Sequence, residues 1–298
     1  MTVLINPKTK LKEEFNEFFR VPLVHQRGTN SLNFTGQRTA LHTVPLGNGL
    51  SLDFYAQLGS NDELVVTFMG ANLPNNNFYP KFSRISSMRG RASALIAFAD
   101  PTMKMDVDQK MLLSWYLGGA GFDPALPILK AIKKAQGKTG SKHVIFIGGS
   151  GGGYAALRIS AMMPGSMAFV QEPQTNIANY IESVVNTYFQ IAWPGWNRHS
   201  LLQAFPERFD MVRHYHQRNP ENFVYYAQSV EDTSHVTNHY MPFKDATGLR
   251  SDDGVSPRGN MMFSLYRGQV SGHGKITPAE YDEHLSKALE FWRSKRGF

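Results

Sequence analysis

Apolar residues along this chain gather in short runs that are separated by longer amphipathic stretches. Unbroken apolar runs are typical of strands buried on both faces of a parallel sheet. Two alternating stretches, 39–44 and 50–57, instead flank Pro45-Leu46-Gly47-Asn48-Gly49, where glycine and asparagine accept the positive φ of a hairpin turn. The pattern predicts a leading antiparallel hairpin followed by a mainly parallel sheet. Its further strands are predicted at 64–69, 94–99, 144–147, 167–171, 223–228 and 261–266.

Helical periodicity occupies the stretches between these strands. The clearest start signal belongs to the last helix, where Thr277 as N-cap, Pro278 at the first position and Glu280 at the third form a capping box. This helix should run to about Arg293. Strands that alternate with helices predict an α/β fold, with helices on both faces of the sheet. The other helices are predicted at 11–19, 109–117, 125–135 and 154–163.

The stretch 174–206 is longer than a crossover between strands requires, and it is rich in aromatic residues. We expect a helical, lid-like excursion over the end of the sheet. Its aromatic residues either fill a small core of their own or, as with Trp193 and Trp196, line a pocket for an acyl chain or a sugar ring. Apart from this insertion and an N-terminal extension at about 1–35, residues 1–298 are expected to form a single domain.

The composition is that of a globular enzyme and excludes several other classes. With 42% hydrophobic and 18% charged residues among 298, the chain is too apolar for intrinsic disorder. No apolar run approaches the roughly 20 residues of a membrane span, and residues 1–8 become polar too early for a secretory signal. A cytoplasmic location is therefore expected. The absence of cysteine rules out disulfides, thiolate metal ligands and a cysteine nucleophile.

The net charge of +7 does not by itself indicate a nucleic-acid partner. Part of it lies on lysines of the 125–135 helix and its exit, and part on the basic end of the last helix, where cations favour the dipole. Solvated helix faces explain both groups, and no recognised nucleic-acid motif accompanies them, so nucleic acid is not an expected partner. The charge could still favour anionic substrates by steering. The lysines are Lys130, Lys133, Lys134, Lys138 and Lys142.

The most informative stretch is Gly148-Gly149-Ser150-Gly151-Gly152, which stands between the 144–147 strand and the 154–163 helix. It is a G-x-S-x-G element in the strand-to-helix context of a nucleophile elbow, where a sharp turn strains the serine and needs glycine beside it. Two phosphate-binding patterns fail, because the G-x-G-x-x-G spacing is broken in each register and no lysine follows the glycines. A structural glycine-rich turn remains the alternative interpretation.

A serine nucleophile needs a base to take its proton and a carboxylate to orient that base. In the chain order Ser, Asp/Glu, His, the strongest histidine is His273, in a glycine-flanked loop between the last strand and the last helix. Asp232, just after the 223–228 strand, is the favoured acid. Glu172, which follows an earlier strand, and Glu231, beside Asp232, satisfy the same order and stay open.

Asp232, His235 and His239 form a second pattern, because the i, i+4 spacing places both imidazoles on one helix face with a carboxylate one turn earlier. Such a set could hold a metal ion. The spacing matches no common zinc motif, however, and the triad already uses Asp232, so no metal and no cofactor are predicted. His235 is then a candidate substrate-binding residue at the pocket edge, and helix packing is the alternative for the histidine pair.

The oxyanion that forms on an attacked carbonyl requires two preorganised N–H donors. Gly151, directly after the nucleophile, is expected to supply one of them. The other should come from Gly70 or Ala71, in the loop after the 64–69 strand, where Gly70 permits a close backbone approach. Asn72, next in this loop, is a candidate substrate-binding residue.

With these residues the chain resembles the α/β-hydrolase fold family of serine hydrolases, from about Leu50 to the C-terminus. It is most similar to hydrolase-like proteins found beside bacterial surface-glycan synthesis and accessory secretion genes. Met69 departs from the family pattern, since many esterases have a histidine before the oxyanion-hole glycine; the backbone donors survive this change, but their support is left open. Stretches similar to Ala99-Asp100-Pro101-Thr102, Ser114-Trp115-Tyr116-Leu117-Gly118 and Asp232-Thr233-Ser234-His235 recur in those proteins.

The resemblance implies a serine hydrolase that cleaves an ester or related acyl group through Ser150, His273 and Asp232. An acyltransferase with the same triad, in which a glycan or other alcohol replaces water, is the first alternative. A non-catalytic hydrolase-fold protein in a glycan or secretion assembly is the second. The acyl group, the acceptor and the oligomeric state do not follow from a shared fold.

Overall fold

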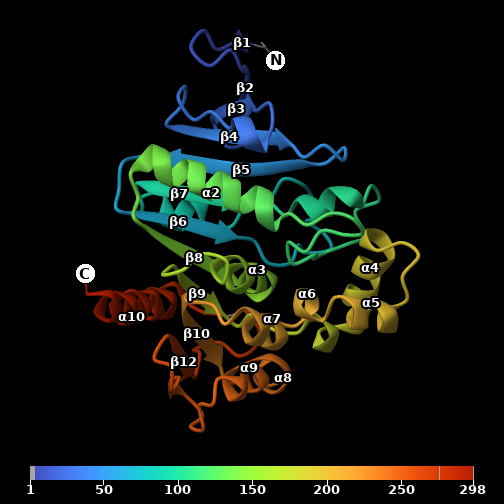
Figure 1. The fold of residues 1–298 in the computed structure, drawn as a ribbon, viewed down its shortest axis with the longest axis vertical. Coiled ribbons are helices and arrows are strands. Elements are labelled where there is room, and N and C mark those ends of the chain that lie inside the picture. Colours follow the sequence, from blue (N-terminus) through green and yellow to red (C-terminus); the bar gives the residue numbers. More distant parts are fainter. Residues whose placement is uncertain (1–3, 275, 298) are drawn as a thin grey trace. The chain divides into compact units, whose positions relative to one another are not determined.

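The computed structural model describes residues 4–274 and 276–297 (Figure 1). The chain falls into two compact units, Met1–Ile145 and Phe146–Phe298, and the boundary lies within strand β8 (His143–Gly149). The single domain expected over 1–298 therefore stays a prediction.

The first unit contains the predicted hairpin and the first buried strands. β4 (Thr39–Pro45) and β5 (Ser51–Leu58) pair antiparallel across the turn, which confirms the hairpin. β6 (Glu63–Phe68) and β7 (Ala94–Phe98) pair parallel, while β5 and β7 run antiparallel, so this part of the sheet is mixed. The predicted helix α2 (Ala125–Thr139) packs on β5 and β6. The unit also contains β1 (Leu4–Ile5), β2 (Lys12–Asn16), β3 (Val21–His25), η1 (Thr29–Ser31), α1 (Ile85–Met88) and η2 (Pro101–Met105).

The helix expected at 11–19 is a wrong prediction, because this segment holds strand β2. Its residues pair antiparallel with β3, and Leu11 is buried beside Val24 and Ala40. Pairing with a neighbouring strand satisfies the backbone donors and acceptors of the segment. Tertiary context therefore overrides the local helical pattern.

The helix expected at 109–117 is also wrong. Trp115 and Tyr116 are buried and have φ values of 51° and 56°, in the left-handed region that a right-handed helix excludes. The carboxylate of Asp100 holds this conformation, since its Oδ2 accepts from the hydroxyl of Ser114 at 2.7 Å and from the N–H of Tyr116 at 2.6 Å. The buried carboxylate of Asp100 thus binds the N–H of Tyr116, which a helix would have used for its own hydrogen bond, and the hydroxyl of Ser114 as well.

In the second unit the strands lie in the order β8, β9 (Met167–Gln171), β10 (Phe223–Ser229), β12 (Met261–Tyr266) and β11 (Gly254–Val255). β9, β10 and β12 pair parallel, as predicted, and the short β11 is antiparallel to β12. Carboxyl ends of parallel strands lie at one edge of a sheet, where ligands gather. The segments that follow β9, β10 and β12 therefore leave the sheet along the same edge.

Helices cover both faces of the sheet in this unit. Tyr225 of β10 hydrogen-bonds His284 of α10 (Pro278–Arg296), whereas the next residue, Tyr226, packs on Phe243 of α9 (Met241–Ala246). Successive strand residues face opposite sides, so α10 and α9 lie on opposite faces, and an α/β fold is confirmed. The other helices are α3 (Ser150–Ser160), η3 (Ile177–Asn179), α4 (Glu182–Ala192), α5 (Arg198–Ala204), α6 (Pro206–Phe209), α7 (Met211–Arg218), α8 (Thr233–His235) and the π-helical turn η4 (Val236–Tyr240).

The start of α10 has the predicted capping box and is tied to the loop before it. One oxygen of Glu280 accepts from the N–H of Thr277 at 2.8 Å, and the Thr277 hydroxyl accepts from the N–H of Glu280 at 3.3 Å. The other oxygen of Glu280 accepts from the N–H of Gln269 at 2.9 Å. A single carboxylate therefore holds both ends of the loop that carries His273, whose neighbouring glycines have φ values of 105° and 68°.

The stretch 174–206 is helical, as predicted, with α4 and α5 as its main elements. Trp193 is 2% exposed, packs against Phe205 and Phe209, and donates its indole N–H to the hydroxyl of Tyr188. It therefore belongs to a small aromatic core within the excursion. Trp196 is 41% exposed at the edge of this core. The lid-like role and substrate contacts of these tryptophans stay predictions.

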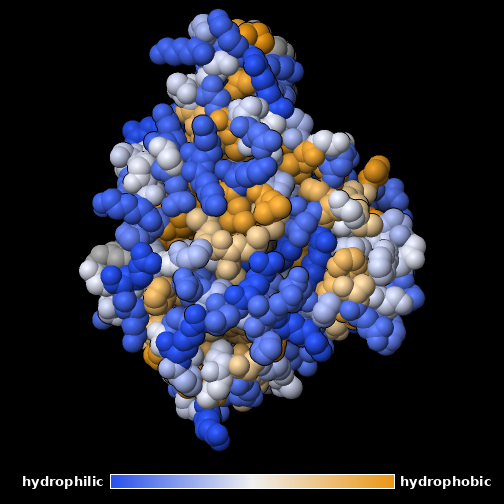
Figure 2. All heavy atoms as spheres, in the orientation of Figure 1, coloured by the Kyte–Doolittle hydropathy of each residue, from blue (hydrophilic) through white to orange (hydrophobic). Residues whose placement is uncertain are grey.

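The basic residues that the sequence analysis assigned to solvated helix faces lie at the surface. The five lysines of α2 and its exit are exposed, as a solvated helix face requires. Figure 2 shows a face dominated by hydrophilic side chains, with hydrophobic ones in smaller groups between them. Within 4–274 and 276–297, none of the helices combines the length and the apolar character that crossing a bilayer would demand.

Candidate active site

Ser150 stands at the turn between β8 and α3 with a φ of 54°, in the left-handed region that is costly for a residue with a side chain. The turn has no room for a side chain at Gly148, where a Cβ would lie 2.1 Å from the carbonyl oxygen of Gly152. A Cβ on Gly153 would lie 2.6 Å from that of Pro173. This strained serine among obligatory glycines has the backbone geometry of a nucleophile elbow.

Gly151 lies in the first turn of α3, immediately after the serine. Backbone N–H groups in the first turn have no partner within the helix, and the dipole of the helix favours negative charge at this end. An oxyanion that forms beside Ser150 would therefore meet a suitable donor here. The role of Gly151 in an oxyanion hole stays a proposal.

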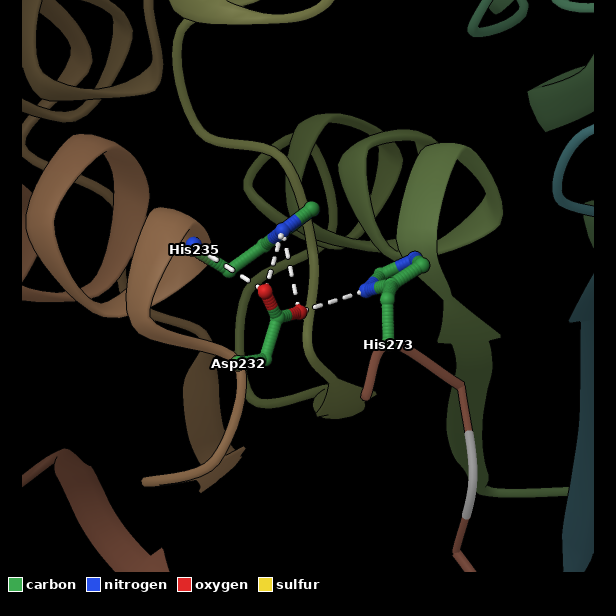
Figure 3. Close-up of side chains that lie close together, drawn as sticks. All are labelled: Asp232, His235 and His273. Atoms are coloured by element: carbon green, nitrogen blue, oxygen red, sulfur yellow. Dashed lines mark hydrogen bonds and ion pairs between the residues drawn. The ribbon is translucent and has the colours of Figure 1, made fainter. Parts of the chain in front are cut away.

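Asp232 lies just beyond the end of β10, beside the Nδ1 atoms of two imidazole rings (Figure 3). Its Oδ2 is 2.7 Å from Nδ1 of His273 and 3.0 Å from Nδ1 of His235, and its Oδ1 is 3.2 Å from the same atom of His235. The side chain of Asp232 is only 7% exposed, whereas that of His273 is 32% exposed. The structure thus brings the predicted acid and base together and adds a second histidine to the acid.

The ionised form of Asp232 is strongly favoured in this setting. Burial raises the pKa of Asp232, but hydrogen bonds from His235 and His273 outweigh burial and hold the pKa well below its usual range. A carboxylate has only acceptors, so each neutral imidazole places its proton on Nδ1 and leaves Nε2 as an acceptor. Nε2 of His273 is then the basic atom of that ring.

Glu172, the alternative acid, also reaches the loop of His273. Its carboxylate is buried, it accepts from the Tyr266 hydroxyl at 2.7 Å and from the N–H of Gly274, and it lies 3.4 Å from Nδ1 of His273. Glu172 itself has a φ of 44°, a second strained residue at this edge of the sheet. Asp232 is therefore the nearer acid, and Glu172 holds the loop. Glu231 instead forms an ion pair with Arg267.

A cation site is the other use of this cluster, since Asp232, His235 and His273 offer ligand atoms within 4.8 Å of one another. The set differs from the sequence pattern, because His239 is replaced by His273. Metal-binding imidazoles direct lone pairs in their ring planes toward one point. The rings of His235 and His273 stack 4.1 Å apart at 18°, which aligns those lone pairs side by side and suits two N–H donors on one carboxylate better.

His239 takes a different position from the one the metal pattern requires. Its Nδ1 accepts from the N–H of Thr175 at 3.3 Å, and its backbone carbonyl accepts from the Thr175 hydroxyl at 2.8 Å. Burial, and next the neighbouring His235, lower the pKa of His239 to about 3. His239 is thus a neutral packing residue that ties η4 to the chain after β9.

Gln174 is the site residue that the sequence analysis did not single out. It is fully buried, and its Nε2 lies 2.9 Å from Oγ of Ser150 and 2.9 Å from Nε2 of His235. The signal that could have found it is its place three residues beyond β9, on the edge where Glu172 was noticed. His235, predicted at the pocket edge, is 6% exposed and faces Asp232 and Gln174.

The expected oxyanion loop lies in the first unit, where Gly70 and Ala71 follow β6. The N–H of Met69 donates to the hydroxyl of Tyr116 at 2.8 Å, and that hydroxyl donates to the carbonyl of Phe98 at 2.8 Å. Tyr116 therefore fixes the start of the loop at Met69, the residue directly before Gly70. Met69 is the position at which the sequence analysis expects a histidine in many esterases.

The stretches 99–102 and 114–118 meet around this tyrosine. Asp100 binds Ser114 and the N–H of Tyr116, and the hydroxyl of Thr102 accepts from the N–H of Gly118 at 2.9 Å. Burial raises the pKa of Asp100 although several donors act against it. Asn72, also buried, donates to the side chain of Asn77, and its contact with a substrate stays a prediction.

No known protein family matches this sequence, and no curated protein is similar to it in sequence. Solved structures do share its fold. The capsule O-acetyltransferase of Neisseria meningitidis serogroup A aligns with a TM-score of 0.61 at 16% identity, over 87% of this chain and 96% of that one. An acetyl xylan esterase from Paenibacillus sp. R4 aligns with a TM-score of 0.53 at 13% identity, over 88% and 90%.

A chain of the glycosylation-associated Gap123 complex from Streptococcus agalactiae aligns with a TM-score of 0.56 at 14% identity, over 85% of this chain and 46% of that one. At such identities the likeness shows the fold alone. The expected resemblance to hydrolase-fold proteins connected with glycan synthesis is confirmed at that level: an α/β fold shared with an acetyltransferase, acetyl esterases and a glycosylation-associated protein.

Proposed function

We propose that this protein is an α/β-hydrolase-fold serine esterase that removes a small acyl group through an acyl-enzyme on Ser150. The observation that carries the proposal is the strained Ser150 in the same unit as a buried carboxylate, Asp232, that holds the imidazole of His273 at 2.7 Å. A left-handed serine costs free energy and persists only where the surrounding structure enforces it, which supports a functional role.

In this proposal Oγ of Ser150 bonds to the acyl carbon while Nε2 of His273 takes the hydroxyl proton. Asp232 stays ionised and keeps the imidazolium oriented through Nδ1–H. His273 then gives the proton to the leaving alkoxide, which departs as an alcohol and leaves an ester on Ser150. A water molecule repeats these steps, so the acid is released and the hydroxyl is restored. The oxyanion donors are the N–H of Gly151 and that of Gly70 or Ala71.

Transfer of the acyl group to a sugar hydroxyl is the second candidate, because the triad chemistry is the same until the acceptor attacks. The likeness to a capsule O-acetyltransferase favours transfer, and the likeness to acetyl xylan esterases favours hydrolysis. Both kinds of neighbour are named for acetyl groups. An acetylated glycan is therefore the first substrate class to test.

A fluorophosphonate probe tests the proposal directly, since it phosphonylates an activated serine. We expect stoichiometric labelling of the wild type and none of Ser150→Ala, together with release of acetate from a model acetyl ester. Product analysis with an added sugar acceptor then separates hydrolysis from transfer. An unlabelled, inactive wild type would leave a non-catalytic role in a glycan or secretion assembly.

A further inference from the structure

A series of hydrogen bonds between side chains links Ser150 to Asp232 through Gln174 and His235, and the proposed triad does not use this route. The amide nitrogen of Gln174 bridges Oγ of Ser150 and Nε2 of His235, at 2.9 Å to each. Nδ1 of His235 in turn lies 3.0 Å from Asp232. Gln174, His235 and Asp232 are all at least nine-tenths buried, so water cannot readily replace the hydrogen bonds between them.

The protons in this series of hydrogen bonds have one consistent arrangement. Asp232 is an acceptor, so His235 donates Nδ1–H to it and its Nε2 becomes an acceptor. The amide of Gln174 must then point its nitrogen, and not its oxygen, toward His235. The same nitrogen has a second hydrogen, which it donates to Oγ of Ser150.

We propose that Gln174 and His235 are positioning residues for Ser150. They hold the serine oxygen as a hydrogen-bond acceptor, so the hydroxyl proton is directed away from Gln174 and toward the base. This inference rests on the proposed function, in which Nε2 of His273 is that base. Asp232 therefore orients the base through one imidazole and the nucleophile through the other.

The arrangement also explains why a second histidine shares the carboxylate. Without His235, the amide of Gln174 could rotate and present its oxygen, which would accept the serine proton and compete with His273. Asp232 prevents this through the fixed tautomer of His235. The strained φ of Ser150 limits where Oγ can lie, and the amide selects the direction of its proton.

The test compares rates of fluorophosphonate labelling and of model acetyl ester hydrolysis. Gln174→Met keeps the size of the side chain and removes the amide. His235→Asn keeps a donor near Asp232 and removes the atom that faces Gln174. We expect each variant to lower the labelling rate and kcat by about tenfold to a hundredfold, with KM little changed. The double variant should be about as slow as the slower single variant, because both changes break the same series of hydrogen bonds.

His239→Asn is the matched control, since His239 is a buried histidine one turn further on that packs beside the His235 ring but hydrogen-bonds Thr175 and not Gln174. It should be labelled at close to the wild-type rate. Circular dichroism and thermal melting identify any variant that has lost its fold. A purely structural role for Gln174 and His235 would show as lower melting temperatures with normal labelling rates in the folded protein.

The inference and the proposed function fail in different ways. Labelling of Gln174→Met at the wild-type rate, or losses that multiply in the double variant, would overturn the positioning role and leave the serine esterase intact. A wild type that is never labelled would instead overturn the proposed function.

Discussion

The imidazole rings of His235 and His273 stack 4.1 Å apart, with 18° between their planes, and both turn Nδ1 toward the carboxylate of Asp232. Oδ1 of Asp232 also accepts from the backbone N–H of His235 at 3.3 Å, so three N–H groups surround this one carboxylate. They also make Asp232 a shared residue, so any change to it affects both rings at once.

Asp232→Asn is the sharpest substitution at the site. Asparagine replaces one acceptor oxygen by an NH2 donor, which favours the wrong tautomer of an imidazole whose Nδ1 faces it, and it removes the negative charge that stabilises the imidazolium. We expect the fold to survive and turnover of a model ester to fall by up to roughly 10⁴-fold. Steady-state kinetics measure the loss.

Glu172→Gln is the matched variant, because Glu172 also lies near Nδ1 of His273 but at 3.4 Å and with Tyr266 as its closer partner. It should cost far less turnover than Asp232→Asn. Near-normal activity in Asp232→Asn together with a collapse in Glu172→Gln would move the acid to Glu172.

Substitutions of Ser150 should reveal the strain at the elbow. Ser150→Ala keeps the left-handed φ of 54°, whereas Ser150→Gly relieves it. Since the left-handed conformation costs a residue with a Cβ about 1–2 kcal/mol, and glycine loses part of this to chain entropy, the glycine variant should be more stable by about 1 kcal/mol. Denaturant unfolding compares the two; equal stabilities would contradict a strained turn.

Tyr116→Phe should loosen the loop of Gly70 and Ala71, because it removes the partner of the Met69 N–H and the donor to Phe98. We expect kcat to fall about tenfold with KM little changed, since a misplaced donor acts on the transition state. Tyr55→Phe, which removes a buried hydroxyl bound to Arg89, is the control and should retain kcat. An unchanged kcat in Tyr116→Phe would argue against a role for this loop.

Acid should destabilise the protein through buried neutral histidines, of which His42 is the simplest. Burial lowers the pKa of His42 to about 3, from an ordinary value of 6.5. As the pH falls through this window the unfolded chain binds a proton that the folded chain refuses, so stability falls by about 1.4 kcal/mol per pH unit. His42→Asn keeps an acceptor for Gln26 and should flatten the slope between pH 6 and pH 4. An identical slope in the variant would refute this assignment.

Esterase activity should survive exhaustive chelation, since the proposed triad needs Nδ1–H groups on Asp232 and not a cation. Activity that is lost to a chelator and restored by zinc would assign a metal to Asp232, His235 and His273. In that case His235→Asn should lower zinc affinity in a calorimetric titration, which distinguishes a true site from a nonspecific effect of the chelator.

Features set by local patterns, or by the order of elements along the chain, were predictable from the sequence. The glycines around Ser150 mark a strand-to-helix turn because a Cβ at Gly148 cannot be accommodated, and this follows from local geometry. The capping box of α10 and the parallel pairing of β9, β10 and β12 follow from short patterns in the same way. The pairing of Asp232 with His273 followed from the order of strands and loops.

Several other features, which depend on contacts between distant residues, were not predictable. The segment 109–117 has an apolar, helix-like pattern, but Asp100 draws it into left-handed backbone conformations that no local pattern signals. Gln174 gives no signal either, because a glutamine after a strand is ordinary until Ser150 and His235 are known to lie on either side of it. Strand β2 replaced a helix for the same kind of reason, since β3 supplies its hydrogen bonds.

The Glu280 carboxylate binds the N–H of Gln269 and the N–H of Thr277, so one side chain clasps the two ends of the loop that carries His273. The segment between Gln269 and Thr277 is thereby held at both ends, independently of the chain before and after it. A residue inserted before Gln269 changes only how the loop is reached, whereas a residue inserted within the clasp displaces His273 itself. The number of residues from Gln269 to Thr277 therefore sets the position of His273. Related chains that keep the same chemistry should vary in length only before Gln269 or after Thr277.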